Sequence, residues 1–164
     1  MTNLQCIVIY LSLTLLSNTV VNAASEIDDI SEFAWQNRII IVNANLQGSV
    51  AKNSDLQSLV DQNIEIEDRD IIWFFISPRF NFSNNSSDSS GNQDEFDIET
   101  NLDRILTKAF QKQLHSLVNE KIQHVVLIGK DGGIKSKSTI LNLTDLFSQI
   151  DMMPMRIIEM RQGQ

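Results

Sequence analysis

Two uninterrupted apolar runs constrain the fold of this 164-residue chain most strongly. Residues 38–44 are Arg-Ile-Ile-Ile-Val-Asn-Ala, and residues 71–76 are Ile-Ile-Trp-Phe-Phe-Ile. Continuous β-branched and aromatic runs of this length are typical of strands that are buried on both faces. Between the runs, residues 53–55 (Asn-Ser-Asp) can cap a helix whose apolar residues follow at helical spacing. Strand, helix and strand in this order predict a parallel pair joined by a right-handed crossover.

The second half of the chain predicts a helix, a hairpin and further helical structure. Apolar residues recur at i, i+3, i+4 and i+7 from Leu102 to Val118, which predicts an amphipathic helix. Residues 124–129 and 134–138 predict two strands joined by Lys-Asp-Gly-Gly, because Asp-Gly between strands is a strong hairpin signal. Asn142 can cap a last amphipathic helix, and Pro154 marks its end or the first turn of another.

The segment at about 78–100 breaks this pattern. It is rich in Ser and Asn and carries too few apolar residues to bury much surface. We therefore expect a disordered insertion loop within one domain that spans residues 24–164.

The first 23 residues have the pattern of a secretory signal. Residues 7–16 form an apolar stretch, and Val21-Asn22-Ala23 fits a cleavage site after Ala23. The alternative is a membrane anchor, but the stretch is shorter than the about 20 apolar residues that a spanning helix needs. We expect a secreted or periplasmic protein without stable membrane insertion. Cleavage would remove Cys6, the only cysteine, and leave a mature chain without thiol chemistry.

The acidic composition excludes two classes of partner. The formal charge is −8 and the sequence pI is about 4.6, whereas nucleic-acid and anionic-membrane binding need concentrated Lys and Arg. Four carboxylates occur close together, at Glu65, Glu67, Asp68 and Asp70. They could hold calcium, but their spacing lacks the glycine and terminal glutamate of an EF-hand, which favours a solvated turn. We expect neither a metal nor a cofactor.

The predicted order of elements resembles the thioredoxin-like arrangement, and residues 124–135 resemble the β-hairpin of peroxiredoxins. Three separated passages are more specific: 35–38 (Trp-Gln-Asn-Arg), 129–135, and 151–156 (Asp-Met-Met-Pro-Met-Arg) followed by Glu159 and Arg161. Together they resemble the bacterial family known as domain of unknown function 4174, over about residues 30–161. This family is related to domains of vertebrate secreted sushi-repeat proteins and equarin.

The resemblance implies an α/β, thioredoxin-like (peroxiredoxin-like) three-layer sandwich, with a central mixed sheet of about four strands flanked by helices. It also implies extracytoplasmic placement and carries no established activity. In a thioredoxin-like enzyme the reactive cysteines follow the first strand. Here that position holds Gln47, Gly48, Ser49 and Val50, and Ile122-Gln123 replaces the proline expected before the hairpin.

These replacements argue against a thiol-disulfide oxidoreductase and against a thiol peroxidase. A triad of Ser49 with His115 or His124 lacks a nucleophile-elbow motif. We interpret each lone histidine as solvated or satisfied by a neighbouring group rather than as functional. The degenerate redox position is therefore not expected to be catalytic.

The candidate binding residues are the charged residues that lie in the family-like passages. An exposed arginine fork could bind a carboxylate, although Arg156 and Glu159 could instead form an i, i+3 surface pair. We expect Trp35 and Arg38 to brace the first strand, and the C-terminal methionines to pack at the core edge or to form a contact patch. The candidates are Lys130, Asp131, Lys135, Arg156, Glu159 and Arg161.

Three functions remain open from the sequence. The first is a binding module for an unknown protein or small ligand. The second is a cysteine-independent enzyme centred on Arg156, Arg161 and Lys130. The third is a structural interaction protein of the envelope or matrix.

Overall fold

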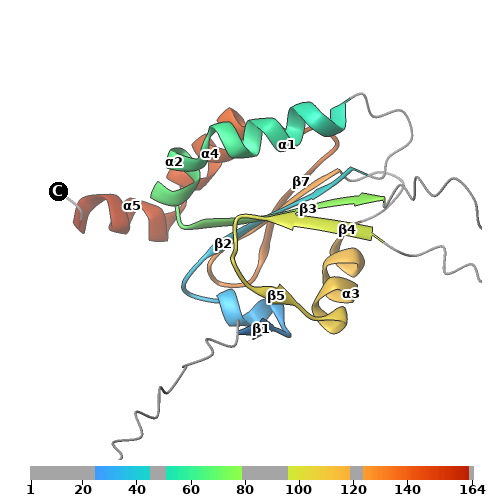
Figure 1. The fold of residues 1–164 in the computed structure, drawn as a ribbon. Helices are drawn as coiled ribbons and strands as arrows, with labels where there is room; N and C mark the ends of the chain where they lie inside the picture. Colours follow the sequence, from blue (N-terminus) through green and yellow to red (C-terminus); the bar gives the residue numbers. More distant parts are fainter. Residues whose placement is uncertain (1–24, 45–50, 79–95, 119–123, 163–164) are drawn as a thin grey trace, which may run out of the picture.

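The computed structural model describes residues 25–44, 51–78, 96–118 and 124–162. Its centre is a five-stranded sheet with the order β4-β3-β2-β6-β7 (Figure 1). The strands are β2 (Arg38–Asn43), β3 (Ile71–Pro78), β4 (Phe96–Thr100), β6 (Val125–Ile128) and β7 (Ile134–Ser138). β2 and β3 are parallel, and every other neighbouring pair is antiparallel.

This topology confirms the expected α/β, thioredoxin-like fold. The parallel pair β2–β3 is joined through α1 (Ala51–Asp61) and α2 (Asn63–Asp68), and the hairpin β6–β7 lies on the other side of β2. The sheet has five strands rather than about four, because β4 adds to the edge beside β3. α1 begins at Ala51, before the expected cap at residues 53–55.

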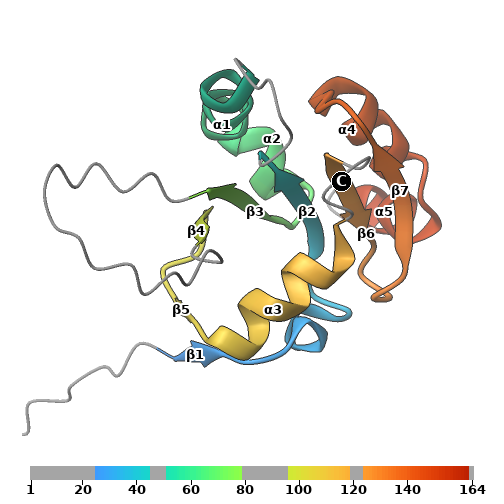
Figure 2. The ribbon, with the colours of Figure 1, turned by 90° about the vertical axis from the view of Figure 1, so that its right-hand side faces the viewer.

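Helices cover both faces of the sheet, as Figure 2 shows. Ile40 and Val42 of β2 face one core, which also contains residues of α1, α2 and α4 (Leu143–Asp151). Ile39 and Ile41 alternate to the opposite core, against α3 (Lys108–Leu117) and the short 3-10 helix η1 (Ile30–Phe33). Because both faces are covered, all six residues of β2 are buried, as its continuous apolar run predicts.

The helix expected from Leu102 begins later than predicted. Thr107 caps α3, and its hydroxyl accepts the Phe110 N–H at 3.3 Å. The preceding residues instead form β5 (Ile105–Leu106), which pairs with β1 (Glu26–Ile27) in a separate two-stranded parallel sheet. Leu102 and Leu106 still pack against the core on the α3 side of the sheet, the first from a loop and the second from β5. Their spacing fits a helical period although neither residue is in a helix.

The predicted loop at about 78–100 is wrong at its two ends. Pro78 is the last residue of β3, and Phe96–Thr100 form β4, which pairs with β3. Residues 79–95 lie outside the described residues. So do the predicted signal with its cleavage site at Ala23, and Gln47, Gly48, Ser49 and Val50. No helix within the described ranges is long and apolar enough to cross a membrane.

The C-terminal elements agree with the sequence. Gly132 has a φ of 76° in the turn between β6 and β7, a conformation that glycine adopts without strain. The side-chain oxygen of Asn142 accepts the Asp145 N–H at 3.2 Å and caps α4. Pro154 opens α5 (Pro154–Gln162).

The expected packing of the C-terminal methionines at the core edge holds for Met153. Met153 packs against the core beneath α4, whereas Met152 and Met160 are exposed. Trp35 was expected to brace β2, but its side chain is 69% exposed and its φ is 67°.

Candidate functional site

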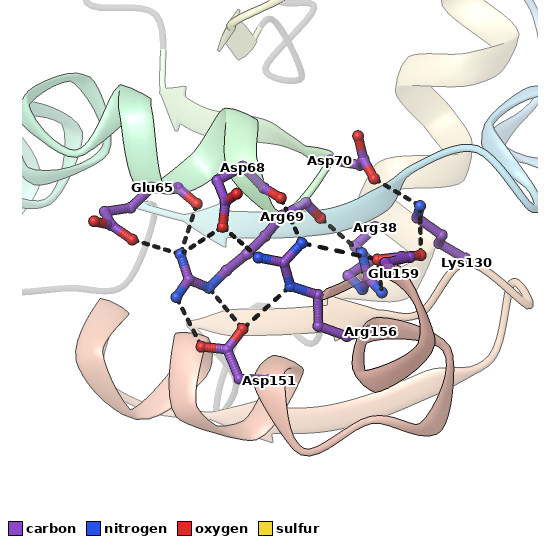
Figure 3. Close-up of polar contacts among 9 residues, drawn as sticks. All are labelled: Arg38, Glu65, Asp68, Arg69, Asp70, Lys130, Asp151, Arg156 and Glu159. Carbon is purple, nitrogen blue, oxygen red and sulfur yellow. Dashed lines mark hydrogen bonds and ion pairs between the residues drawn. The ribbon is translucent and has the colours of Figure 1, made fainter. Parts of the chain in front are cut away.

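Nine charged residues from distant parts of the chain meet at one edge of the sheet (Figure 3). β2 and β3 are parallel, so their amino ends lie at the same edge. β6 is antiparallel to β2, so the turn that follows β6 returns to this edge, where the ends of α2 and α4 and the start of α5 also meet. The residues of this charged cluster are Arg38, Glu65, Asp68, Arg69, Asp70, Lys130, Asp151, Arg156 and Glu159.

Glu159 of α5 joins two buried cations, one on β2 and one in the hairpin turn. Its Oε1 lies 2.8 Å from Lys130 Nζ and its Oε2 lies 3.0 Å from Arg38 Nη2. Burial opposes ionisation of Glu159, but the hydrogen bonds from Lys130 and Arg38 outweigh it and hold the pKa of this carboxyl below its usual range. Lys130 Nζ also donates to Asp70 Oδ2 at 2.7 Å. Lys130 therefore links the hairpin turn to α5 and to the residue before β3.

Arg38 is 1% exposed, and its contacts explain why a charge is tolerated at this buried position. Besides Glu159, it donates from Nη1 to the Arg69 carbonyl at 2.8 Å. Its Nε is buried and has no hydrogen-bond partner among the described residues. A buried guanidinium is costly unless it is paired, so α5 supplies an anion that this strand needs.

Arg156 and Arg69 form the other half of the cluster. Arg156 donates to the carbonyl of Asp68 at 2.7 Å, to the carboxylate of Asp68, and to Asp151 Oδ1 at 3.4 Å. Arg69 donates to Asp151 from Nε to Oδ1 at 3.0 Å and from Nη2 to Oδ2 at 2.7 Å. Its Nη1 pairs with Glu65 Oε2 at 2.6 Å. Burial raises the pKa of Asp151, but the two arginines outweigh it and the pKa lies below its usual range.

The structure brings together three of the six candidate binding residues: Lys130, Arg156 and Glu159. The expected exposed arginine fork is wrong for Arg156, which is 7% exposed. The expected i, i+3 pair of Arg156 with Glu159 has a long separation of 4.0 Å, and both residues make shorter contacts elsewhere.

The other three candidates lie outside the cluster. Lys135 Nζ and Asp131 Oδ2 are 2.6 Å apart in the hairpin. The hydrogen bonds from Lys135 and the Gly133 N–H hold the pKa of Asp131 below its usual range. Arg161 is exposed near the end of α5 and has no ion-pair partner within the described part of the chain.

Sequence reasoning missed most partners of the cluster. The carboxylates at residues 65–70 were interpreted as a solvated turn, yet Glu65, Asp68 and Asp70 each pair with a cation. One signal was available, because an arginine at the start of a strand buried on both faces requires an anion nearby. Local spacing could not identify the residue that supplies this anion.

The structure also places His124 and the side chains that a metal ion would need. His124 is buried, and its Nε2 lies 2.8 Å from Asp55 Oδ2, so it is a paired core histidine as expected. No group of three His, Cys, Asp or Glu residues suited to a metal ion occurs in the ranges that the structure describes.

Comparison with known proteins assigns the chain to a family. Among solved structures, it is similar to the mitochondrial 2-Cys peroxiredoxin from Plasmodium falciparum, with 14% identity, a TM-score of 0.48, and coverage of 75% of this chain and 79% of that chain. No curated protein matches it. A family model matches residues 29–159, most of the chain, and the chain therefore belongs to the domain of unknown function family DUF4174.

Proposed function

We propose that this protein is an extracytoplasmic thioredoxin-like module that acts by binding a protein or a small ligand, without thiol chemistry. The fold supplies a rigid sheet with helices on both faces. The sequence supplies a leader-like segment that contains the only cysteine. A module of this kind would keep the scaffold and use its surface for recognition.

The engagement of the charged cluster is the observation that weighs against the catalytic alternative. Lys130 is 9% exposed and Arg156 is 7% exposed, and each contacts two carboxylates. A catalytic cation must reach the reacting group, whereas these two are held by anions of the same chain. This arrangement weighs against an enzyme centred on Arg156, Arg161 and Lys130, and favours a structural role for the cluster.

Export is the first test. When the full-length chain is produced in a bacterium with a Sec system, we expect the secreted or periplasmic product to begin at Ala24. Intact-mass measurement of the purified product reads this directly. A variant with Arg in place of Ala23 serves as the control, since a bulky charged residue at the −1 position blocks cleavage. A product that retains Met1 and stays in the cytoplasm would contradict the proposed location.

The exported protein should also be inactive in thiol chemistry. We expect no reduction of insulin disulfides and no peroxide consumption above the rate without protein, because thiolates are the nucleophiles in both reactions. Turnover by the cysteine-free product would overturn the non-redox part of the proposal.

A further inference from the structure

A hollow of about 340 Å³ opens beside the charged cluster, on the side of η1. It lies at the amino ends of β2 and β3, and its volume falls near the lower end of small-ligand sites, enough for one side chain or a small molecule. Part of its lining is apolar: Leu102 is half-buried, whereas Phe33, Ile71 and Ile72 are at most 6% exposed. The rest of the lining is polar.

The polar groups of the hollow differ in how many of their donors and acceptors are already used by the chain. Asn101 uses both ends of its amide on the backbone of β3, accepting from Trp73 N and donating to Ile71 O, each at 3.1 Å. Arg104 donates to the carbonyls of Ser25 and Glu26 and pairs with Glu32 at 3.1 Å. The cation of the hollow is therefore already paired, and its Nε and Nη2 donate to the chain itself.

The groups that remain available are mainly acceptors. Glu67 is exposed and accepts one hydrogen bond, from Asn63 Nδ2 to its Oε1, which leaves Oε2 free among the described residues. Asp70 is half exposed and uses Oδ2 on Lys130, which leaves Oδ1. The exposed Gln36 makes no side-chain hydrogen bond in the described part of the chain.

The hollow thus combines an apolar wall with free carboxylate oxygens, and this combination selects a particular ligand. A guanidinium offers five N–H donors and no acceptor, and the methylene stem of arginine packs on apolar surface. An anion would meet the uncompensated carboxylate of Glu67, whereas the charges of Glu32 and Asp70 are offset by Arg104 and Lys130. The chain's net charge of −8 adds long-range attraction for cations.

We propose that this hollow binds the guanidinium group and apolar stem of an arginine. This inference rests on the binding function proposed above and names a site and a ligand chemistry for it. The guanidinium would donate to Glu67 and Asp70, with its stem against Ile72 and Leu102. The arginine could be a free amino acid or part of a polypeptide, and the two sources share this chemistry.

The test is a titration of the exported protein with Nα-acetyl-arginine amide, followed by amide chemical shifts. We expect saturable shifts at residues around the hollow, with a Kd on the order of 1 mM. Acetyl-citrulline amide has the same shape without the charge and should bind at least about threefold more weakly. Free arginine and a blocked Gly-Arg-Gly peptide then distinguish the two sources, because a free amino-acid site binds free arginine more tightly and a polypeptide site binds the blocked peptide more tightly.

Two variants that remove the same charge distinguish binding in the hollow from non-specific attraction of a cation to an acidic protein. Glu67→Gln should weaken acetyl-arginine amide binding about threefold, since it removes an exposed carboxylate that faces the ligand. Asp145→Asn removes the same charge from α4, near the opposite edge of the sheet, and should leave the affinity unchanged.

Three results would overturn the proposal: equal weakening in both variants, equal binding of citrulline, or no saturable shift at about 10 mM probe. None of these results would restore thiol activity or alter export. A failure at the hollow is therefore distinguishable from a failure of the proposed function in its location or its lack of thiol chemistry, which the export and thiol assays address.

Discussion

Replacing Arg38 with alanine should lower the free energy of unfolding by about 3 kcal/mol. The guanidinium is 1% exposed, and its removal leaves the Arg69 carbonyl without this donor and Glu159 with Lys130 and the long contact to Arg156. It also leaves a cavity where the side-chain stem packs. Glu159 is about a quarter exposed and can recover some hydration, so the loss falls at the lower end for a broken buried pair. Urea unfolding followed by circular dichroism measures this change.

Two further variants separate the pairing of Arg38 from its bulk. Arg38→Lys retains the charge but cannot bond the Arg69 carbonyl and Glu159 from one planar group, so it should recover less than half of the loss. Arg161→Ala removes an exposed arginine of α5 and should change stability by less than about 0.5 kcal/mol. An Arg38→Ala protein as stable as the wild type would show that α5 is not held through this contact.

The fold was more predictable from the sequence than the partners of the site. The apolar runs of β2 and β3 and the Asp-Gly hairpin are local signals, and all three elements appear where their residues predict them. β5 was missed because Ile105 and Leu106 fit a helical period, while the pairing with β1 that decides their conformation involves residues 79 positions away. Local spacing carries no information about such a pairing.

The same separation along the sequence limits how much of the candidate site can be predicted. The resemblance to the family passages placed Lys130, Arg156 and Glu159 in one set, and the structure brings these three residues together. Their partners are far along the chain, since Lys130 meets Asp70 across 60 positions and Arg156 meets Asp68 across 88. Only the topology of the sheet makes these pairs neighbours. The burial of Arg156, which decides between a ligand site and an internal pair, follows from that topology and not from the residue type.

Acidification should destabilise the protein because carboxylates of the cluster have lowered pKa values. The pKa values of Glu159 and Asp151 lie below their unfolded values, so the unfolded chain binds more protons as the pH falls. Asp29 adds to this effect, because hydrogen bonds from Ser31 and Gln113 lower its pKa to about 2. The stabilisation is fully present above about pH 5 and is lost as the pH falls through the lowered pKa values. Urea unfolding between pH 7 and pH 3 should therefore show a level region followed by a decline.

Glu159→Gln assigns part of this decline to the charged cluster. Near pH 7 the variant should be less stable than the wild type, because a neutral amide cannot pair with Lys130 and Arg38 as strongly as a carboxylate. As the pH falls, the wild-type carboxyl becomes protonated and resembles the amide, so the gap between the two proteins should close. A gap of constant size from pH 7 to pH 3 would mean that Glu159 stabilises the fold through packing alone. A closing gap would show that α5 is held to β2 and to the hairpin turn by charge.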